Sequence, residues 1–392
     1  MKGLYLTGDY APRPGYTLSG RELDGDRRAL NGNAIWKNTK LTLRDDIPMP
    51  AVGPDEILVH VKYCGVCGSD VHFYETDEEG YMLFPGHTKL PVVIGHEFSG
   101  KVVEVGPAVR DIQVGDLVTV EEMNWCGECS PCRAGYLNQC RRLEELGFTL
   151  NGAFAEYVVA RAKYAWKLND IAEATGDEDK TYRVGAMVEP SSVAYNGVIS
   201  ASGGIKPGQH VAVFGAGPIG CAAIQILRAA GAAKIFAFEM RAERRELAAL
   251  SGATHVYDPT ELKQQGTSAA EVIMQETKGQ GVAMGVEAAG ATRAVVPEIE
   301  NALAVGGKLV QVGMVAGETP LHLLTYQTKR AAMYGAIGHS GHENFPNVIQ
   351  LMAAGRIDMA GIATATFPLD QALEAMEETA KRTGGKVLVR AS

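Results

Sequence analysis

The sequence lacks any apolar run long enough to cross a membrane, and it has fewer basic than acidic residues. No stretch of about 18 apolar residues occurs in it. Asp9, Pro12 and Pro14 lie where a secretory signal would need an apolar core. The formal net charge of −9 argues against a nucleic-acid-binding surface, which normally needs a basic face. We therefore expect a cytoplasmic protein that binds neither a membrane nor nucleic acid.

Cysteine is scarce, and its distribution is uneven. Seven cysteines in 392 residues are poor evidence for disulfides in a compartment that keeps thiols reduced. Six of the seven fall into two groups, namely Cys64 and Cys67, and Cys126, Cys129, Cys132 and Cys140. Such clustering indicates metal binding. Cys64 and Cys67 alone could be mistaken for a redox pair.

The second cysteine group predicts a structural zinc site. Its spacing of two, two and seven intervening residues places four thiols, Cys126, Cys129, Cys132 and Cys140, in one short lobe. Four soft thiolates in tetrahedral geometry suit a closed zinc site that stabilises a loop and takes no part in chemistry. An iron–sulfur cluster and four free thiols are the alternatives.

The pattern of strands and helices changes near Glu189. With 46% hydrophobic and 21% charged residues, the chain is that of a globular protein, and it is too long for one ordinary core. Before Glu189, short strands such as 57–63 and 101–105 are punctuated by Gly and Pro, which predicts a β-rich domain. After it, strands alternate with helices, which predicts a doubly wound parallel sheet.

These patterns predict two domains. The second-domain elements are strands 211–214, 234–238, 281–287 and 308–312, a helix ending near 230, and helices 242–250 and 291–304. Helices 342–354 and 370–381 and a closing strand 386–389 follow. We predict a catalytic domain of residues 1–190 with 338–392 and a dinucleotide-binding domain of residues 191–337. Residues 8–34 form a polar stretch to which the sequence assigns no function.

Gly215, Gly217 and Gly220 form a dinucleotide-binding motif in the right context. An apolar strand precedes them and a helix follows. The first glycine makes the tight turn, the second lets the backbone approach a pyrophosphate, and the third packs helix on strand. The helix N-terminus then offers free N–H groups and partial positive charge to the phosphates.

Glu239 favours NAD over NADP. It ends the second strand, where an acid would hydrogen-bond the ribose hydroxyls and repel a 2′-phosphate. Arg241, Arg244 and Arg245 follow it, and an arginine there would instead hold that phosphate. The alternative is that these arginines form a solvated helix face.

A second, dispersed set of residues suggests a catalytic zinc. Cys67 follows a strand, His96 and Glu97 lie between strands, and Glu189 lies at the domain junction. Cysteine, histidine and carboxylate with one open position are typical of a catalytic zinc. Each is weak evidence alone, but alcohol oxidation needs both a Lewis acid and a hydride acceptor, so the set gains weight beside the glycine motif.

Together these motifs resemble the zinc-dependent medium-chain alcohol and polyol dehydrogenases over nearly the whole chain. The order is the same: Cys-Gly-Ser-Asp at 67–70, Gly-His-Glu at 95–97, the four-cysteine lobe, Glu-Pro at 189–190 and the glycine motif. The resemblance implies an α/β protein with a β-rich GroES-like catalytic domain and a Rossmann domain. It also implies two zinc ions per chain, NAD as cofactor, and a homo-oligomer, a tetramer rather than a dimer.

The resemblance assigns roles residue by residue. It makes Cys67 and His96 ligands of the catalytic zinc, with Glu97, Glu189 or both completing the set. Glu189 stands where alcohol-type members carry cysteine and polyol-type members glutamate, which points to polyols. Asp70 is expected to orient the zinc histidine, and Ser69 and His72 to relay the proton released from the substrate. The expected cofactor contacts are Gly215, Gly217, Ile219, Gly220, Glu239, Arg244, Val312 and Gly313.

Several segments resemble a branch of the family that acts on cyclitols in inositol breakdown. They are residues 76–81, 121–125, 152–157 and 338–342, and the long N-terminal extension also fits that branch. Sorbitol-type members carry Arg-Tyr where this chain has Gly338 and His339, so His339 or His342 is expected to bind substrate hydroxyls. The alternative is that these two histidines only begin a helix.

Three other functions stay open. The first is an acyclic diol such as butanediol, a sugar, or an amino alcohol such as threonine as substrate, because the zinc chemistry would be identical. The second is an NAD-binding sensor without catalysis, although every ligand position is filled. The third is a zinc-ribbon nucleic-acid binder, which the acidic balance opposes.

Overall fold

The computed structural model describes residues 1–315 and 317–392, and the chain divides into two compact units. The first unit holds residues 1–189, 363–382 and 386–392, and the second holds 190–362 and 383–385. Among the described residues, no helix has the length and apolar character that a membrane span requires.

The unit limits differ from the predicted domain limits at residue 190 and in residues 338–362 and 383–385, all of which were predicted to belong to the catalytic domain. Residues 338–362, which the sequence analysis grouped with the catalytic domain, pack within the second unit. The physical reason lies in side-chain hydrogen bonds within that unit. Asn196 Nδ2 donates to the Gly338 carbonyl over 2.9 Å, and Ser200 Oγ lies 2.6 Å from Asn344 Oδ1. The chain therefore returns to the first unit only at residue 363.

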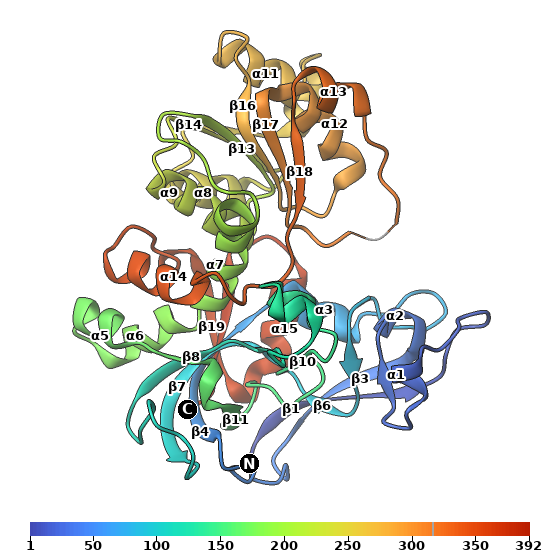
Figure 1. The fold of residues 1–392 in the computed structure, drawn as a ribbon, viewed down its shortest axis with the longest axis vertical. Coiled ribbons are helices and arrows are strands. Elements are labelled where there is room, and N and C mark those ends of the chain that lie inside the picture. Colours follow the sequence, from blue (N-terminus) through green and yellow to red (C-terminus); the bar gives the residue numbers. More distant parts are fainter. Residues whose placement is uncertain (316) are drawn as a thin grey trace. The chain divides into compact units, whose positions relative to one another are not determined.

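The first unit is built on a mainly antiparallel sheet in the order β12-β8-β7-β4-β20-β19, in which β11 pairs with β4 and β19 pairs parallel with β20. Its members are β4 (Glu56–Val66), β7 (Glu97–Val105), β8 (Leu117–Val120), β11 (Tyr157–Arg161), β12 (Ala165–Lys167), β19 (Ala363–Pro368) and β20 (Lys386–Arg390). The last two strands join a sheet otherwise made from the first 170 residues, and β20 pairs antiparallel with β4 (Figure 1).

Smaller elements surround this sheet. A second sheet joins β3 (Trp36–Arg44), β1 (Gly3–Tyr10) and β6 (Val92–Val93), and two-stranded pairs join β2 (Arg28–Ala29) to β5 (Thr88–Lys89) and β9 (Met123–Asn124) to β10 (Glu144–Glu145). The helices are α1 (Gly20–Leu23), α2 (Gly32–Ile35), α3 (Gly68–Tyr74), α4 (Ser130–Arg133), α5 (Asn169–Thr175), α6 (Glu178–Gly185) and α15 (Ala372–Ala380). α7 (Val188–Tyr195) carries the chain from the first unit into the second.

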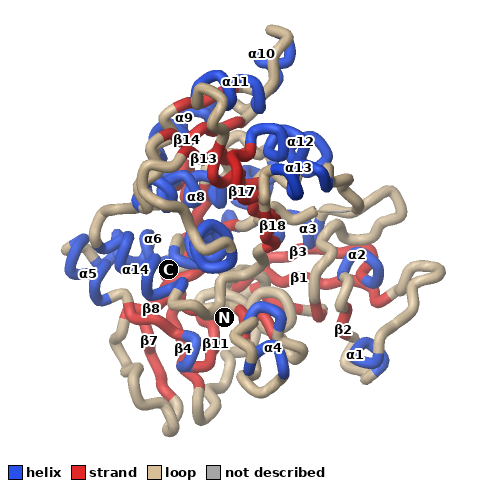
Figure 2. Tube along the Cα trace, turned by 45° about the horizontal axis from the view of Figure 1, so that its top comes forward, coloured by secondary structure: helices blue, strands red, loops and turns tan. Residues whose placement is uncertain are grey.

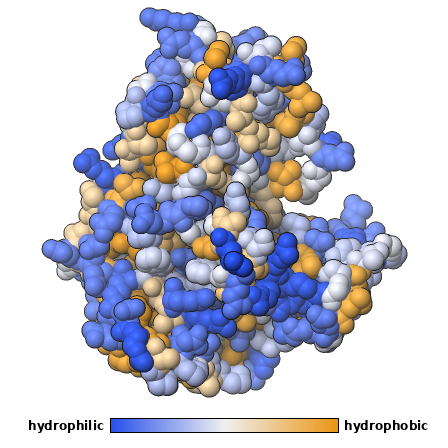
Figure 3. Space-filling model, in the orientation of Figure 1, coloured by the Kyte–Doolittle hydropathy of each residue, from blue (hydrophilic) through white to orange (hydrophobic). Residues whose placement is uncertain are grey.

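Burial follows the side-chain pattern of the strands. Along β3, residues alternate between more and less exposed positions, as expected for a strand with one face on the core. β4 is buried on both faces over most of its length because neighbours cover it on each side. Figure 3 shows hydrophilic residues over most of the face that the first unit presents, with isolated apolar residues between them.

The second unit contains the predicted parallel sheet. Its order among the described residues is β15-β14-β13-β16-β17-β18, so the strand order reverses between β13 and β16. The strands are β13 (His210–Phe214), β14 (Lys234–Phe238), β15 (His255–Tyr257), β16 (Val282–Glu287), β17 (Leu303–Gln311) and β18 (Ala332–Gly335). This is the doubly wound arrangement, in which ligands bind outside the carboxyl ends of the strands at such a reversal.

Helices cover both faces of this sheet. They are α8 (Pro218–Ala229), α9 (Ala242–Ser251), α10 (Pro259–Gln264), α11 (Ala269–Glu276), α12 (Thr292–Ala302), α13 (Leu323–Thr328) and α14 (Asn344–Ala353). α8 and α9 lie on one face, and α11 and α12 pack on the other through a core that includes Ile273, Val296 and Ile299 (Figures 1 and 2). The predicted α/β fold is confirmed.

Candidate functional site

Cys67 is held at the start of α3 by Asp70. The chain leaves β4 at Val66, Cys67 forms the N-cap of the helix, and its backbone N–H donates to Asp70 Oδ2 over 2.9 Å. Asp70 is fully buried. The Cys-Gly-Ser-Asp sequence thus combines a cysteine at the helix start with an acid three residues later that ties down its backbone.

His96 lies beside this helix start, in the turn before β7. Gly95 precedes it with a φ of +98°, and a Cβ there would come within 2.6 Å of the Phe154 ring, so the position requires glycine. His96 Nδ1 lies 3.5 Å from Asp70 Oδ1, and its ring packs 4.7 Å from that of Phe148. Burial alone would lower the pKa of His96, but attraction to Asp70 and Cys67 outweighs it and raises the pKa.

Cys67, His96 and Glu97 form a compact set of donor atoms. One ligand atom from each lies within 4.8 Å of the other two. Three different side chains, a soft sulfur, an imidazole and a carboxylate, converge from two elements of one unit. The chemistry of this set fits zinc, which accepts all three donor types.

Lys386 binds Glu97 at the base of this set. Its ammonium group lies 2.6 Å from both carboxylate oxygens of Glu97 and donates to the Val66 carbonyl over 3.1 Å. The two side chains are 2% and 1% exposed, so neither charge has water to replace its partner. Burial acts to lower the pKa of Lys386, but the Glu97 carboxylate overrides it and the pKa is raised.

Glu189 lies apart from that compact set. It is buried in the first turn of α7, and its carboxylate lies within 4.8 Å of that of Glu122, which is buried as well. The predicted catalytic-zinc ligands are therefore brought together only in part. Cys67, His96 and Glu97 converge, while Glu189 is paired with an acid that the sequence analysis did not single out.

The two predicted proton-relay residues lie on α3. Ser69 Oγ is buried and has no hydrogen-bond partner among the described residues, as expected of a group that awaits a ligand. His72 is one helical turn further, partly exposed, with Nδ1 3.2 Å from Glu75 Oε2. Ser69 therefore has a hydroxyl without a partner among the described residues, and His72 lies where solvent can reach it.

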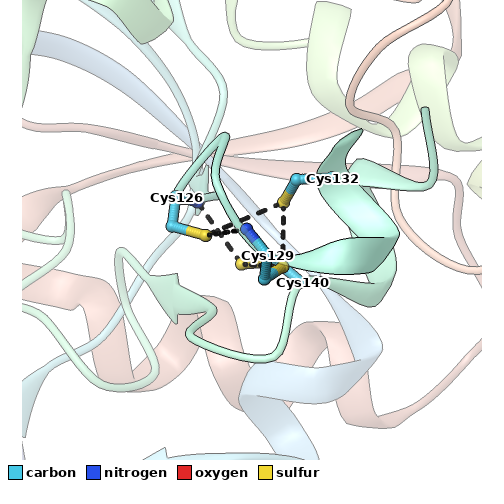
Figure 4. Close-up of side chains that lie close together, drawn as sticks. All are labelled: Cys126, Cys129, Cys132 and Cys140. Carbon is cyan, nitrogen blue, oxygen red and sulfur yellow. Dashed lines mark hydrogen bonds between the residues drawn. The ribbon is translucent and has the colours of Figure 1, made fainter. Parts of the chain in front are cut away.

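The four cysteines of the second group converge as predicted. Their sulfur atoms lie within 4.8 Å of one another, and the separations include 3.4, 3.8 and 4.0 Å. Figure 4 shows the four side chains pointing toward a common centre. Zinc–sulfur bonds of about 2.3 Å in a tetrahedron put the sulfurs about 3.8 Å apart, so the observed spacing fits zinc.

Backbone N–H groups in this lobe stabilise the thiolate form of a cysteine. Cys126 Sγ accepts N–H groups of Glu128 and Cys129, each over 3.4 Å, and these bonds lower the pKa of Cys126 to about 5. Burial raises the pKa of Cys132 to about 12. The lobe therefore favours the thiolate form of Cys126 and disfavours that of Cys132. A bound cation would stabilise all four thiolates.

The glycine motif has the geometry of a pyrophosphate loop. Gly215 has a φ of +93°, and a Cβ on Gly220 would lie 1.9 Å from the Gly215 carbonyl oxygen. Gly217 caps α8, and the nearest atoms to a Cβ there belong to the Arg244 guanidinium, 3.6 Å away or more. The first and third glycines are thus needed for the turn and the packing, and the second leaves the backbone open. Ile219 follows in the first turn of α8.

Glu239 lies under this loop. Its carboxylate accepts the N–H groups of Ala216 and Arg241, each over 2.9 Å. Arg245 is held by Asp258, because its Nη1 donates to that carboxylate and to the Glu239 and Met240 carbonyls. Arg244 is the arginine closest to the loop, with its Nε donating to the Gly384 carbonyl over 3.0 Å.

The end of β17 contributes Val312 and Gly313. Both backbone N–H groups donate to the Glu287 carbonyl, over 3.0 and 2.9 Å. The fully buried Glu287 side chain also accepts from Ala289, Ala291 and Gln311. Glu287 therefore organises the carboxyl end of β16, next to the reversal of strand order.

His339 and His342 precede α14 and differ from each other. The His339 ring packs 4.9 Å from that of Phe345, and its carbonyl accepts from Asn344 Nδ2. His342 adopts a φ of +51° in the turn before the helix. The contacts of His339 are those of a residue at a helix start, and the roles of both histidines in substrate binding stay predictions.

Sequence reasoning missed Lys386, Glu122 and Glu287. Each has an ionisable side chain that the fold buries. Lys386 is 289 residues from Glu97, and its sequence context, Gly385 before an apolar strand, gives no sign of a partner. Glu287 carried a weak signal, because it ends a predicted strand of the parallel sheet as Glu239 does.

Comparisons with known proteins agree with this geometry. A family model described as an alcohol dehydrogenase GroES-like domain matches residues 53–170, and one described as a zinc-binding dehydrogenase matches residues 218–354. The first match covers most of the zinc-ligand candidates and the whole four-cysteine lobe, and the second covers the glycine motif from Pro218 onward.

Individual relatives match nearly the whole chain. The scyllo-inosose 3-dehydrogenase of Thermotoga maritima is 42% identical over 382 residues, which are 95% of this chain and 94% of that protein. The L-threonine 3-dehydrogenase of Caldanaerobacter subterraneus is 35% identical over 87% of this chain and 93% of its own. A solved Thermotoga maritima structure, provisionally described as an alcohol dehydrogenase, is 40% identical with a TM-score of 0.94 and 99% coverage of both chains.

Replacing Cys132 by serine tests the four-cysteine lobe. We expect Cys132→Ser to bind one zinc fewer per chain and to lose more than about 2 kcal/mol of unfolding free energy, because metal loss is among the strongest destabilising mechanisms. Elemental analysis and denaturant unfolding measure both. Ser130→Ala, on the exposed side of the same lobe, is the matched control. Full zinc content in Cys132→Ser would contradict the assignment.

Replacing Lys386 by methionine tests the buried ion pair. Lys386→Met leaves the Glu97 charge uncompensated, so we expect a loss of about 3–5 kcal/mol of unfolding free energy in the metal-free protein. Because the pKa of Lys386 is raised above its ordinary 10.5, the stabilisation should persist through neutral pH and disappear only above about 10.5. Lys381→Met, which removes an exposed lysine, is the control and should change little. Equal stability of the two variants would refute the role of the pair.

Proposed function

The chain belongs to the zinc-binding medium-chain alcohol and polyol dehydrogenases, a family of oxidoreductases, and from this membership we propose that it oxidises a secondary hydroxyl of a cyclitol to a ketone with NAD. The observation that carries the proposal is the convergence of Cys67, His96 and Glu97 in a chain that also has the complete glycine motif. The 42% identity to a scyllo-inosose dehydrogenase over 95% of the chain supports scyllo-inosose as the substrate.

The residues that would hold the catalytic zinc are Cys67 and His96, with Glu97 or Glu189 as the carboxylate ligand. Bound zinc would supply Lewis acidity to the substrate hydroxyl, and bound NAD would supply a hydride acceptor. Asp70 would keep the His96 imidazole oriented, since its Oδ1 faces His96 Nδ1 while its Oδ2 is occupied by the Cys67 amide.

The proton would leave through α3. Ser69 Oγ, buried and without a partner among the described side chains and backbone, would accept the hydroxyl proton. His72, partly exposed and hydrogen-bonded to Glu75, would deliver it to solvent. One short helix thus carries both a candidate metal ligand at its start and a path for the proton along its length.

Glu239 supports NAD as the cofactor. Its buried carboxylate ties the glycine loop at Ala216 and repels a further negative charge at the same place. Arg245 is engaged with Asp258, which leaves Arg244 as the candidate for a cofactor contact. Gly215, Gly217, Ile219 and Gly220 would receive the pyrophosphate, with Val312 and Gly313 at the neighbouring strand end.

An amino alcohol is the second candidate substrate. The 35% identity to an L-threonine dehydrogenase favours it, because the same zinc and proton chemistry would serve. Butanediol and sugars are further alternatives, and an NAD-binding sensor is the alternative without catalysis. His339 or His342 would bind substrate hydroxyls in the cyclitol proposal.

A homo-oligomer, preferably a tetramer, and a cytoplasmic location complete the proposal. β18 ends the sheet of the second unit, and Met333 on it is 43% exposed. Leu323 and Leu324 of α13 are 69% and 56% exposed. Exposed apolar residues beside an edge strand are typical of a surface that a second copy covers.

Replacing Cys67 by serine tests the catalytic zinc. Cys67→Ser should lower kcat by at least about a thousandfold, because a metal ligand is lost, while the dissociation constant of NAD stays unchanged. Steady-state kinetics and calorimetric NAD titration make the two measurements. Cys64→Ser, three residues earlier on β4, is the control and should keep its activity. Normal turnover by Cys67→Ser would refute the metal assignment.

A substrate screen tests the reaction. NAD reduction should be fast with inositols or inososes and at least about tenfold slower, in kcat/KM, with hexitols, butanediols and threonine. The same screen with NADP should give a lower kcat/KM, because of Glu239. Preference for threonine or butanediol would overturn the cyclitol proposal, and the absence of turnover with all of these compounds would favour the sensor.

A further inference from the structure

Residues 11–34, which we call the N-terminal strap, are not used by the proposed reaction but are built into the first unit. Their backbone is fixed at both ends. Ala11 N–H donates to the Ile35 carbonyl over 2.9 Å and Arg13 N–H to the Ala34 carbonyl over 2.8 Å. The strap therefore leaves the end of β1 and returns to the start of β3 as a closed loop.

A buried carboxylate holds the inside of the strap together. Glu22 is 4% exposed, and it accepts the backbone N–H groups of Ser19 and Leu30, each over 2.8 Å, and the hydroxyl of Tyr16 over 3.1 Å. Burial alone would raise the pKa of Glu22, but these bonds lower it. The strap is thus an ordered element with an ionised centre.

Arg13 fastens the strap to residues 77–81. Its Nη1 donates to Glu79 over 2.8 Å, its Nη2 donates to Asp77, and its guanidinium lies 3.9 Å above the Tyr81 ring. Its Nε donates to the Asn33 carbonyl within the strap over 2.8 Å. One planar group thus meets two carboxylates, a carbonyl and a ring, which is the recognition that arginine performs best.

Arg28 fastens the strap at a second place. Its Nη1 lies 2.5 Å from Glu144 Oε1 and 3.2 Å from His87 Nε2. The side chain is only 12% exposed, and its charge is balanced by Glu144 and by Asp26, which lies within the strap. β2, which carries Arg28, also pairs with β5 at Lys89, so backbone and side chain join the same segment.

The segment held by both arginines, residues 76–89, continues directly from α3. Leu83 and Phe84 N–H both donate to the His72 carbonyl, over 3.1 and 3.0 Å. The Phe84 ring contacts those of Phe73 and Phe148, and the Phe148 ring in turn contacts His96. Figure 1 shows α1 and α2 on the side of the first unit where α3 lies. The strap therefore contacts residues 76–89, and these residues in turn contact His72.

We propose that Arg13 and Arg28 are positioning residues, which clamp residues 76–89 so that this segment fixes the carboxyl end of α3 and, with it, His72. The role assigned to His72 rests on the proposed function. The clamp itself rests on the contacts of the two arginines alone. In this chain the strap and the Asp-Glu-rich sequence at 77–79 are the two halves of one contact.

The variants Arg13→Ala and Arg28→Ala test the clamp in the full-length holoenzyme. Amide hydrogen exchange at Leu83 and Phe84 should become at least about tenfold faster, because the local opening of residues 76–89 is no longer resisted. Turnover of the polyol substrate should fall by about tenfold in kcat with KM little changed, since the proton path and not substrate binding is displaced. Zinc content and NAD affinity should equal those of the wild type.

Arg44→Ala is the matched control. Arg44 also pairs with a carboxylate, Asp46, over 2.7 Å and stacks 4.9 Å over a tyrosine, Tyr5, but it contacts neither the strap nor residues 76–89. Glu79→Gln, which removes one exposed partner of Arg13, serves if Arg28→Ala does not fold and should show the same changes to a smaller extent.

Three results would overturn the proposal. Exchange at 76–89 in Arg13→Ala no faster than in Arg44→Ala would show that the arginine does not hold the segment. Faster exchange with unchanged kcat would show that the segment does not position the proton path. Loss of zinc would place the effect at the metal. A wild type inactive on every polyol would refute the proposed function, while the exchange measurement would still decide the clamp.

Discussion

The buried ion pair between Lys386 and Glu97 is the contact on which the candidate metal site depends. It joins the last strand, β20, to the first residue of β7, and Lys386 also binds the Val66 carbonyl one residue before Cys67. Two of the three converging donors, Cys67 and Glu97, are therefore positioned by a residue near the end of the chain. Since both charges are nearly inaccessible to water, neither partner has a substitute. The chain passes through the second unit and returns to the first unit at residue 363. This return places Lys386 beside Glu97.

The two candidate metal sites differ in what surrounds their donor atoms. In the four-cysteine lobe, the sulfur atoms contact backbone N–H groups and one another. In the Cys67–His96–Glu97 set, each ligand is tied to a charged neighbour: Cys67 to Asp70 through its backbone, His96 to Asp70, and Glu97 to Lys386. A closed site needs only its own ligands, whereas a reactive one must keep a position open and yet stay rigid, which requires outer contacts of this kind.

How far the sequence predicted the molecule depended on how local each signal was. The four-cysteine lobe and the glycine motif were visible because their chemistry lies within about 15 and 6 residues, and turn geometry does the rest. The alternation of strands and helices likewise gave the parallel sheet. The roles of Lys386 and Glu122 could not be predicted, because the residues that surround a buried ionisable side chain lie far from it in the sequence. The placement of 338–362 was missed for the same reason: its contacts are side-chain hydrogen bonds to Asn196, Ser200 and Gln225, which leave no periodic trace.

The contacts also change which residues can carry substrate specificity. Residues 76–81 contributed to the cyclitol resemblance, yet Asp77, Glu79 and Tyr81 are engaged by Arg13 of the strap. Glu121, in another such segment, accepts the Trp166 indole N–H. Similarity in these segments therefore reflects a shared fold more than a shared substrate.

Glu122 differs, because its buried carboxylate lies beside that of Glu189. Glu122 is therefore a residue of those segments that lies next to a candidate zinc ligand.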